Sequence, residues 1–312
     1  MGEACSDGEK IGWNVMALKL WHISGKTYYI DCPSVVGVYL FDSRYCLLID
    51  TGSSRECAAA ILELLDERGI RPFGIINTHF HADHCAGNRL IQERSNCRIF
   101  ASQPDACFIQ NPILAPFVLF SAYPHPPLKN RLLLAQPSRV TDIVEEGALE
   151  LAGATFQVID LRGHTLGQIG IVTPDGVAFL GDALIAPEIM ERFRFHYLAD
   201  LGSHFKTLDF LSKAGFERAV LAHGGPLENL RETVDRNREL FSEIIALLLE
   251  ILKTPRSREE VLFMLVDALS LPMNTTQYYL IMASVSAFLS YLCTKRLIAA
   301  RITDGSMEFS VV

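Results

Sequence analysis

Four side chains that can bind metal ions lie close together in the sequence. Residues 77–88 read NTHFHADHCAGN, which places His79, His81, Asp83 and His84 just after an apolar run. In an extended chain, side chains two residues apart project to the same side, so His79 and His81 can bind one ion together. Asp83 and His84 fall where a helix begins, and we expect them to face a second ion. Burying these groups without a cation is costly, which favours a metal site over a chance polar loop.

Three further candidates follow, each at the end of an apolar run and beside a glycine. They are His164 in RGHTLG, Asp182 in FLGDAL and His223 in LAHGG. A loop at the end of a sheet is expected at each point, because glycine permits tight turns after strands. Each residue is weak evidence alone, since a single histidine beside a strand is common in protein cores. Their order and spacing together make the combination specific.

Short apolar runs and turn signals alternate through the first part of the chain. The runs 13–21, 35–41 and 45–50 predict adjacent strands of one sheet. Apolar positions at helical spacing predict a helix over 55–68, and an apolar run at 73–77 leads directly into the histidine cluster. Alternating strands and helices are typical of a layered α/β fold.

The segment 111–137 differs in composition from its surroundings. It contains six prolines mixed with Phe117, Phe120 and Tyr123. Proline removes a backbone donor and disfavours both regular helix and central strand, so we expect a long loop here. Its apolar character fits a lid or a partner-facing surface, or else a loop packed permanently on the core.

The last part of the chain is predicted to form helices followed by a hairpin. An apolar stripe predicts a helix from about 226 to 252, after which Thr254 and Pro255 interrupt the pattern. Two helices and two strands should follow, an order similar to that of a winged helix. We therefore expect a catalytic domain at 1–230 with an insertion at 111–137, a connecting helix at 231–253 and a winged-helix-like domain at 254–312.

The composition argues against a nucleic-acid-binding, disulfide-bonded or membrane-spanning protein. The 312 residues include 28 Lys and Arg against 36 Asp and Glu, a formal net charge of −8 that repels nucleic acid and anionic lipid. The eight cysteines are scattered without a CxxC pair, so we expect reduced thiols. The polar first ten residues and the interrupted apolar stretches predict neither a secretion signal nor a membrane span. A cytoplasmic location is therefore expected.

The combination of motifs resembles the metallo-β-lactamase superfamily, and within it the glyoxalase II-like hydrolases. The match covers roughly residues 12–230, including the strand end at Asp50-Thr51-Gly52, the HxHxDH core, the GHT turn, the GD element and the last histidine. The resemblance implies an αββα sandwich of the α/β class with two divalent metal ions at one edge. It also implies the ligands: His79, His81 and His164 for one ion, Asp83, His84 and His223 for the other, and Asp182 bridging both.

The ligand types suit zinc, with iron or manganese as alternatives, because imidazoles and carboxylates bind all three. Two ions close together lower the pKa of a bridging water toward about 7, so attack by hydroxide on a scissile carbonyl is the expected chemistry. Asp83 is expected to orient the hydroxide and assist proton transfer. Asp50 and Thr165 are expected to hold ligand imidazoles by hydrogen bonds. The alternative for Asp50 is a turn former before Gly52.

These features favour a metal-dependent hydrolase of a small-molecule ester, thioester or lactone. One group of true β-lactamases has Cys in place of Asp182, and acyl-homoserine lactonases usually have Tyr in place of Ile185, which argues against both activities. Residues downstream of Asp182 are expected to contact the substrate, because rings there can flank it and an arginine can meet an anionic group. They are Phe193, Arg194, His196 and Tyr197, whose alternative role is to pack a helix.

Two other functions are considered. The string THxHADH is also similar to iron-dependent persulfide or thiol dioxygenases, in which His79, His164 and Asp182 would hold one iron. The C-terminal part could instead make the protein a nucleic-acid-binding or RNA-processing protein, but its five basic and five acidic residues give no electrostatic footprint. We therefore expect a small-molecule substrate and no nucleic-acid or membrane partner. The apolar C-terminal face is expected to pack, to form a homodimer, or to be one wall of the substrate pocket.

Overall fold

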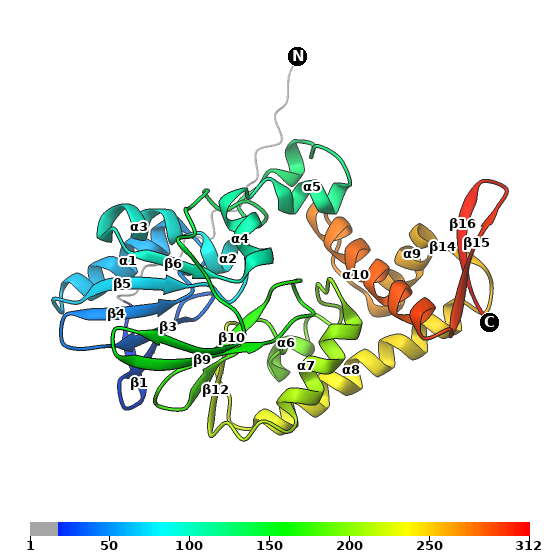
Figure 1. Ribbon diagram of the computed structural model, residues 1–312. Coiled ribbons are helices and arrows are strands. Elements are labelled where there is room, and N and C mark those ends of the chain that lie inside the picture. The colour runs from blue at the N-terminus through cyan, green and yellow to red at the C-terminus, as the bar shows by residue number, and fades with distance from the viewer. Residues whose placement is uncertain (1–17) are drawn as a thin grey trace, which may run out of the picture.

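The computed structural model describes residues 18–312, and the strand expected at 13–21 lies largely outside them. Figure 1 shows two β-sheets packed face to face, with helices on the outer side of each. The predicted αββα sandwich of the α/β class is confirmed. No helix within the described range is both long enough and apolar enough to cross a membrane, and no disulfide joins its cysteines.

The first sheet has seven strands in the order of the chain. Its first four strands pair antiparallel through short turns, and the later pairs are parallel because helices connect them. The parallel strands all end at the same edge of the sheet. The strands are β1 (Leu20–Ser24), β2 (Thr27–Ile30), β3 (Val36–Leu40), β4 (Tyr45–Ile49), β5 (Arg71–Ile76), β6 (Arg98–Ala101) and β7 (Asp142–Ile143).

The second sheet has six strands, and its loops meet those of the first sheet at one edge. Antiparallel hairpins build most of it, and a single parallel pair joins β11 to β12. The strands are β8 (Gly147–Leu151), β9 (Ala154–Asp160), β10 (Ile169–Val172), β11 (Val177–Phe179), β12 (Arg218–Leu221) and β13 (Gly225–Pro226).

Aromatic side chains fill the space between the two sheets. Tyr39 packs edge-to-face on Phe156, with ring centroids 4.9 Å apart. Phe100 from the first sheet and Phe179 from the second belong to the same buried cluster. Gly37 leaves room for one of these rings, because a Cβ at this position would lie 2.6 Å from the Phe179 ring. Close packing between the sheets fixes the relative positions of their loops.

Helices α1 (Arg55–Asp66) and α3 (Asn88–Ser95) cover the outer face of the first sheet. Two helices follow the histidine cluster, because α2 (Ala82–Cys85), which contains Asp83 and His84, ends before α3 begins. The chain passes close to the preceding loop at Gly87, where a Cβ would lie 2.6 Å from the Thr51 carbonyl oxygen. Gly87, where the two segments approach closely, is the N-cap residue of α3.

The proline-rich segment is more regular than predicted. It contains the helix α5 (Leu114–Phe120) and the 3-10 turn η1 (Pro126–Leu128), so the expectation of a loop without regular helix is wrong. Pro116 falls in the first turn of α5, where a missing backbone N–H costs nothing because no intrahelical acceptor is available for it. Helix α4 (Gln103–Gln110), which precedes this segment, was not predicted.

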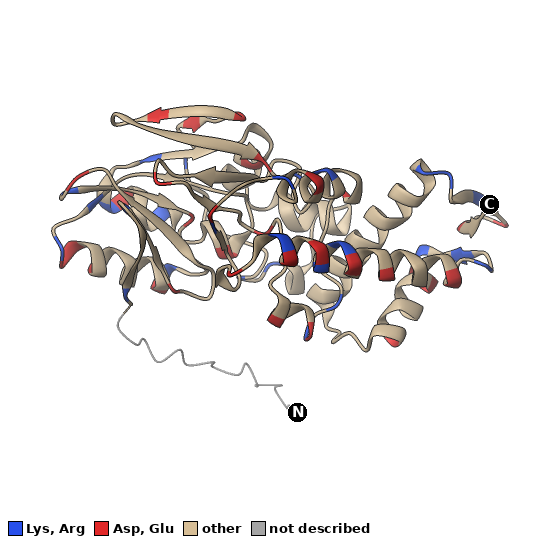
Figure 2. Cartoon of the chain, turned by 90° about the horizontal axis from the view of Figure 1, so that it is seen from below, with Lys and Arg blue, Asp and Glu red and all other residues tan. Residues whose placement is uncertain are grey.

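Three helices pack against the outer face of the second sheet or follow its loops: α6 (Pro187–Met190), α7 (Leu201–Leu211) and α8 (Leu230–Ile251). Sequence reasoning predicted only the last. Figure 2 shows Lys and Arg interleaved with Asp and Glu along the long helix α8. Ion pairs such as Arg236 with Glu232 lie on this exposed stripe, while the opposite side of the helix is buried in the core.

After α8 the chain forms a short strand, two helices and a hairpin. These are β14 (Arg256–Ser257), α9 (Arg258–Leu269), α10 (Thr275–Thr294), β15 (Ile298–Thr303) and β16 (Ser306–Val311). The three strands form one small sheet in the order β14-β16-β15. Figure 1 shows α10 reaching back toward α5, and a hydrogen bond of 2.9 Å from Asn130 Nδ2 to Thr276 Oγ1 joins the insertion to α10. The domain boundaries and the winged-helix likeness stay predictions.

Candidate metal centre

The metal-binding side chains gather at the edge where loops of the two sheets meet. His79 and His81 follow β5, and Asp83 and His84 lie in the short helix α2. His164 follows β9, Asp182 follows β11 and His223 follows β12. Since the strands are held by the sheet-to-sheet core, loops that are far apart in the sequence are fixed at one place.

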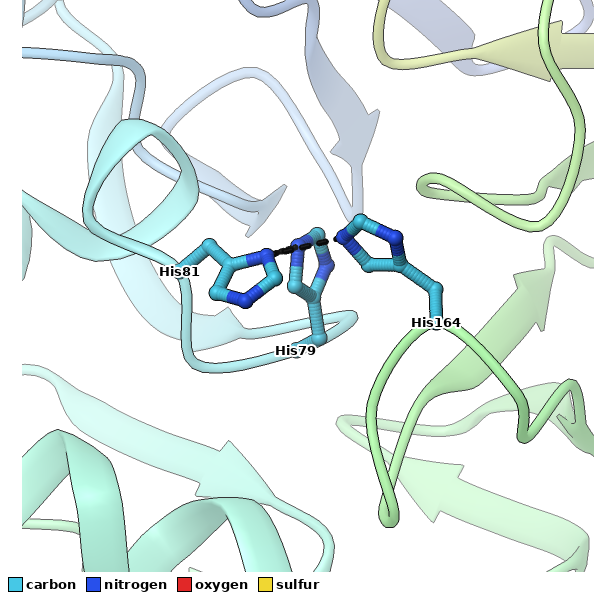
Figure 3. A group of neighbouring side chains, drawn as sticks. All are labelled: His79, His81 and His164. Atoms are coloured by element: carbon cyan, nitrogen blue, oxygen red, sulfur yellow. Dashed lines mark hydrogen bonds between the residues drawn. The ribbon is translucent and has the colours of Figure 1, made fainter. Parts of the chain in front are cut away.

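Three histidines form one group at this edge. His81 Nδ1 lies 3.1 Å from His79 Nε2 and 2.8 Å from His164 Nε2. Figure 3 shows the three rings converging from two separate loops. Nitrogen atoms at these separations, all within 4.8 Å of one another, can bind a single ion.

A second group contains Asp83, His84 and His223, whose ligand atoms are also within 4.8 Å of one another. His223 Nε2 lies 3.1 Å from Asp83 Oδ2, and His84 Nε2 lies 3.6 Å from the same oxygen. The loop after β5 therefore contributes to both groups, with the histidines of the HxH pair in one group and the next two candidates in the other.

Asp182 lies between the two groups. Its Oδ2 atom is 3.5 Å from Nε2 of both His84 and His164. The same oxygen is 3.7 Å from His223 Nε2 and 3.8 Å from His79 Nε2. A single carboxylate oxygen thus faces histidines of both groups.

The electrostatics of the site fit divalent cations. His84 is fully buried, and its Nε2 atom has no hydrogen-bond partner among residues 18–312. Burial opposes charging of this ring, but Asp182, Asp83 and Asp50 together hold the pKa of His84 well above its usual range. Burial lowers the pKa of His81 to about 3, which leaves its lone pair free. Carboxylate oxygens and imidazole nitrogens are the donor set that zinc, iron and manganese share.

Asp50 orients His84 from behind. Its Oδ2 atom lies 2.9 Å from His84 Nδ1, and its two oxygens accept hydrogen bonds from the backbone N–H and the hydroxyl of Thr78 at 2.8 Å and 2.7 Å. Asp50 has a φ of 62°, a conformation that non-glycine residues rarely adopt. With Nδ1 facing Asp50, Nε2 is the nitrogen of His84 that faces the metal site and can bind an ion once it has lost its proton.

Backbone carbonyl groups orient two other ligands. His164 Nδ1 lies 2.9 Å from the Tyr197 oxygen, and His223 Nδ1 lies 3.1 Å from the Pro33 oxygen. With Nδ1 facing a carbonyl group, Nε2 is the ring nitrogen that faces the site in both histidines.

Asp105 is a site residue that the sequence analysis missed. It lies in α4 and is buried, and its Oδ2 atom accepts hydrogen bonds from the Phe80 N–H at 3.1 Å and the Thr165 hydroxyl at 2.8 Å. It therefore joins the HxH loop to the loop that carries His164. Thr165, which was expected to hold an imidazole, donates to Asp105 instead. In the sequence, Asp105 belongs to the pattern Ser102-x-x-Asp105, which indicates the start of a helix. This pattern does not indicate that the Asp105 side chain joins two loops of the site.

Of the four residues predicted to contact the substrate, one lines a cavity beside the metal site and three do not. Tyr197 lines a cavity of about 240 Å³ beside the site, whereas Phe193, Arg194 and His196 are not among its lining residues. Arg194 is half exposed and pairs with Glu243 at 3.0 Å. Burial lowers the pKa of His196 to about 4, so its ring is neutral at neutral pH. A role in substrate binding stays a prediction for all four.

The cavity has a polar end and an apolar end. His81, Asp83, His164 and Asp182 form the polar end. The remainder is lined mainly by apolar residues of α4, α5, the loop after η1, and α10, which supplies Leu280. The C-terminal part therefore forms one wall of the cavity, one of the roles considered for its apolar face.

Comparison with known proteins agrees with this geometry. The model of the family described as the Metallo-beta-lactamase superfamily matches residues 30–224, which is more than half of the chain. The chain therefore belongs to the metallo-β-lactamase superfamily, and the predicted resemblance is confirmed at this level.

Curated relatives match only parts of the chain. A hydroxyacylglutathione hydrolase of Hyphomonas neptunium is 36% identical over 114 residues, covering 36% of this chain and 34% of the relative. A hydroxyacylglutathione hydrolase of Cereibacter sphaeroides is 34% identical over 160 residues, covering 49% of this chain and 52% of the relative. The matches thus span between a third and about half of these relatives.

Solved structures are similar over nearly the whole chain. A metallo-beta-lactamase family protein from Thermus thermophilus has a TM-score of 0.69 at 19% identity, covering 95% of this chain and 99% of that chain. A beta-lactamase domain protein from Burkholderia ambifaria has a TM-score of 0.72 at 15% identity, covering 94% of each chain. At these identities the likeness shows the fold alone.

Proposed function

We propose that this protein is a dinuclear metal-dependent hydrolase of a small-molecule ester, thioester or lactone. The observation that carries the proposal is the position of Asp182 Oδ2, within 3.8 Å of histidine nitrogens from both ligand groups. One bridging carboxylate between two three-residue groups is an arrangement for two ions, for which zinc is the first candidate.

Two divalent ions held by the seven ligand residues would supply an activated water nucleophile and would polarise the carbonyl group of the substrate. The side chains of the protein would orient the water and accept its proton. Asp83 lines the cavity and is partly exposed to it, so its carboxylate can accept a proton from an attacking water. Burial alone would favour the protonated form, but His84 and His223 hold the pKa of Asp83 well below its usual range. The carboxylate is therefore ionised, which is the form that can bind a cation or accept a proton.

The relatives support a thioester among the first substrates to test. Several of the curated proteins similar to this chain are hydroxyacylglutathione hydrolases, although each matches only part of its length. Ester, thioester and lactone carbonyls need the same attack by water, so the site chemistry does not separate them. A panel containing all three is the appropriate assay.

The single-iron dioxygenase places different demands on the site. It needs His79, His164 and Asp182 alone, and it gives no role to the group formed by Asp83, His84 and His223. The second group, with its ligand atoms within 4.8 Å of one another, favours the two-ion hydrolase. Oxygen consumption with a persulfide by the iron-loaded protein would instead favour the dioxygenase.

Hydrolysis by the zinc-loaded protein tests the proposal. We expect metal-dependent turnover of at least one ester, thioester or lactone, and loss of that turnover in Asp182→Ala with the fold intact by circular dichroism. His22→Ala, which removes an exposed histidine on β1, is the matched control and should keep full activity. Retained hydrolysis in Asp182→Ala would refute the mechanism.

A further inference from the structure

The cavity beside the metal centre has an apolar end built from segments that are far apart in the sequence. Phe80 belongs to the HxH loop itself, and its ring stacks on Phe108 of α4 with centroids 4.2 Å apart. Leu119 of α5 and Leu133 after η1 extend this surface, and Leu280 of α10 closes it. The apolar surface thus begins directly at the metal ligands and continues away from them.

The charged side chains that line the cavity have one sign. Its ionisable lining residues other than histidine and tyrosine are Asp83, Asp105 and Asp182. No Lys or Arg of the described chain lines it. A carboxylate or phosphate placed in the apolar end would lose its hydration without gaining a cationic partner, which is costly. Arg194, the cation expected to meet an anionic substrate, pairs with Glu243 outside this cavity.

We propose that the cavity binds an uncharged apolar substituent of the substrate's scissile carbonyl group, an aliphatic chain of medium length or a single aromatic ring. This inference rests on the proposed hydrolase function and narrows its substrate class. The volume of about 240 Å³ sets the size, because a dry apolar cavity of roughly 150 Å³ already accommodates benzene. The polar end holds the carbonyl carbon at the metal centre while the apolar group fills the space between α4, α5 and α10.

An ester offers two substituents, and two series of substrates separate them. In one series the acyl chain grows from acetyl to octanoyl with a constant ethyl thioester leaving group. In the other, acetate esters carry alcohols from methanol to octanol. We expect kcat/KM to rise by up to about 4-fold per methylene, the factor for complete burial of one such group, until the cavity is full. The series with the steeper rise identifies the substituent that occupies the cavity.

A charged end group tests the electrostatic half of the inference. The adipoyl thioester has about the length of the hexanoyl thioester but ends in a carboxylate. We expect the hexanoyl compound to have the higher kcat/KM. In Leu119→Arg, which places a cation in the apolar wall, the preference should shift toward the adipoyl compound by at least about 10-fold. Phe117→Arg, on the same helix at an exposed position that does not line the cavity, is the matched control and should keep the wild-type preference.

Binding to the metal-free protein separates failure of this inference from failure of the proposed function. Titration calorimetry with 2-octanone and with 7-oxooctanoate compares two ketones of similar length that cannot be hydrolysed. Tighter binding of 2-octanone, weakened in Leu119→Arg, supports the apolar cavity whether or not turnover is found. Equal or tighter binding of 7-oxooctanoate, or flat profiles in both substrate series of an active enzyme, would overturn the inference and leave the hydrolase standing. Absence of metal-dependent turnover together with the expected ketone binding would refute only the hydrolase.

Discussion

Replacing Asp50 by asparagine removes one oxygen from a buried carboxylate that receives three hydrogen bonds. The donors are the backbone N–H of Thr78 at 2.8 Å, its hydroxyl at 2.7 Å and His84 Nδ1 at 2.9 Å. Asparagine has nearly the same shape and also tolerates the left-handed backbone conformation of this position, where φ is 62°. The substitution therefore changes hydrogen bonding more than packing or backbone strain.

The amide of Asp50→Asn can be oriented in two ways, and each has a cost. If its oxygen faces His84, its NH₂ group faces the Thr78 backbone N–H, and two donors oppose each other in a buried place. This lowers the free energy of unfolding by about 1–3 kcal/mol. If the amide is flipped, its NH₂ group faces His84 Nδ1, and the ring must carry its proton on Nε2. That proton occupies the position from which His84 would bind metal.

In both orientations His84 loses the nearby negative charge of Asp50, which favours a cation at its group, and in the flipped orientation the Nε2 proton also blocks binding. We expect the affinity of the metal-free protein for zinc at this group to fall by about 10- to 100-fold, the usual effect of removing a partner that orients a ligand. Zinc titration by calorimetry, together with urea unfolding of the metal-free protein, measures both quantities. The control is Asp42→Asn, an exposed turn residue that accepts hydrogen bonds from Arg44 and Tyr45 backbone N–H groups. Wild-type zinc affinity and unchanged unfolding in Asp50→Asn would refute this account of His84.

Three other outcomes follow from the structure. Removing metal with a chelator should lower the free energy of unfolding, by about 2.7 kcal/mol relative to protein held at a free metal concentration of 100 Kd, and a chelator-insensitive melting temperature would contradict this. Gly37→Ala should cost about 1–3 kcal/mol because its Cβ would lie 2.6 Å from the Phe179 ring, whereas Gly215→Ala, with open space around it, should be nearly neutral. Burial raises the pKa of Asp105 from 3.8 to about 7. In the metal-free protein, the folded state then retains a proton that the unfolded state releases, so the free energy of unfolding falls by at most about 4 kcal/mol as pH rises from about 4 to 7. When the free energy of unfolding, measured with urea, is plotted against pH, its decrease between pH 4 and 7 should be smaller in Asp105→Asn than in the wild type. An equal decrease in both proteins would contradict the assignment.

The sequence was most informative where local spacing alone places side chains. His79, His81, Asp83 and His84 come from a single loop, so a strand followed by a helix start predicts their proximity. His164, Asp182 and His223 were recognised by their glycine-flanked strand ends and by resemblance to a family. Their convergence depends on the packing of two sheets, which no single segment of the sequence specifies.

The missed features depend on contacts between distant segments. Asp105 has the sequence context of an ordinary helix start, and only the fold brings its carboxylate to Phe80 and Thr165. Helix α5 was missed because proline was counted against a helix without regard to its position, and Pro116 lies in the first turn. The contact of α10 with the insertion joins residues 146 positions apart at Asn130 and Thr276. Such contacts between distant segments set the shape of the cavity, and a local sequence pattern cannot predict them.

The central claim is that this chain holds two metal ions at the edge of its sandwich. Elemental analysis of the purified protein, before and after loading with zinc and removal of excess metal, tests it most directly. We predict about two divalent ions per wild-type chain and a loss of bound metal in Asp182→Ala, because that carboxylate faces both ligand groups. A single iron per chain, retained after incubation with zinc, would contradict the two-ion account and favour the dioxygenase.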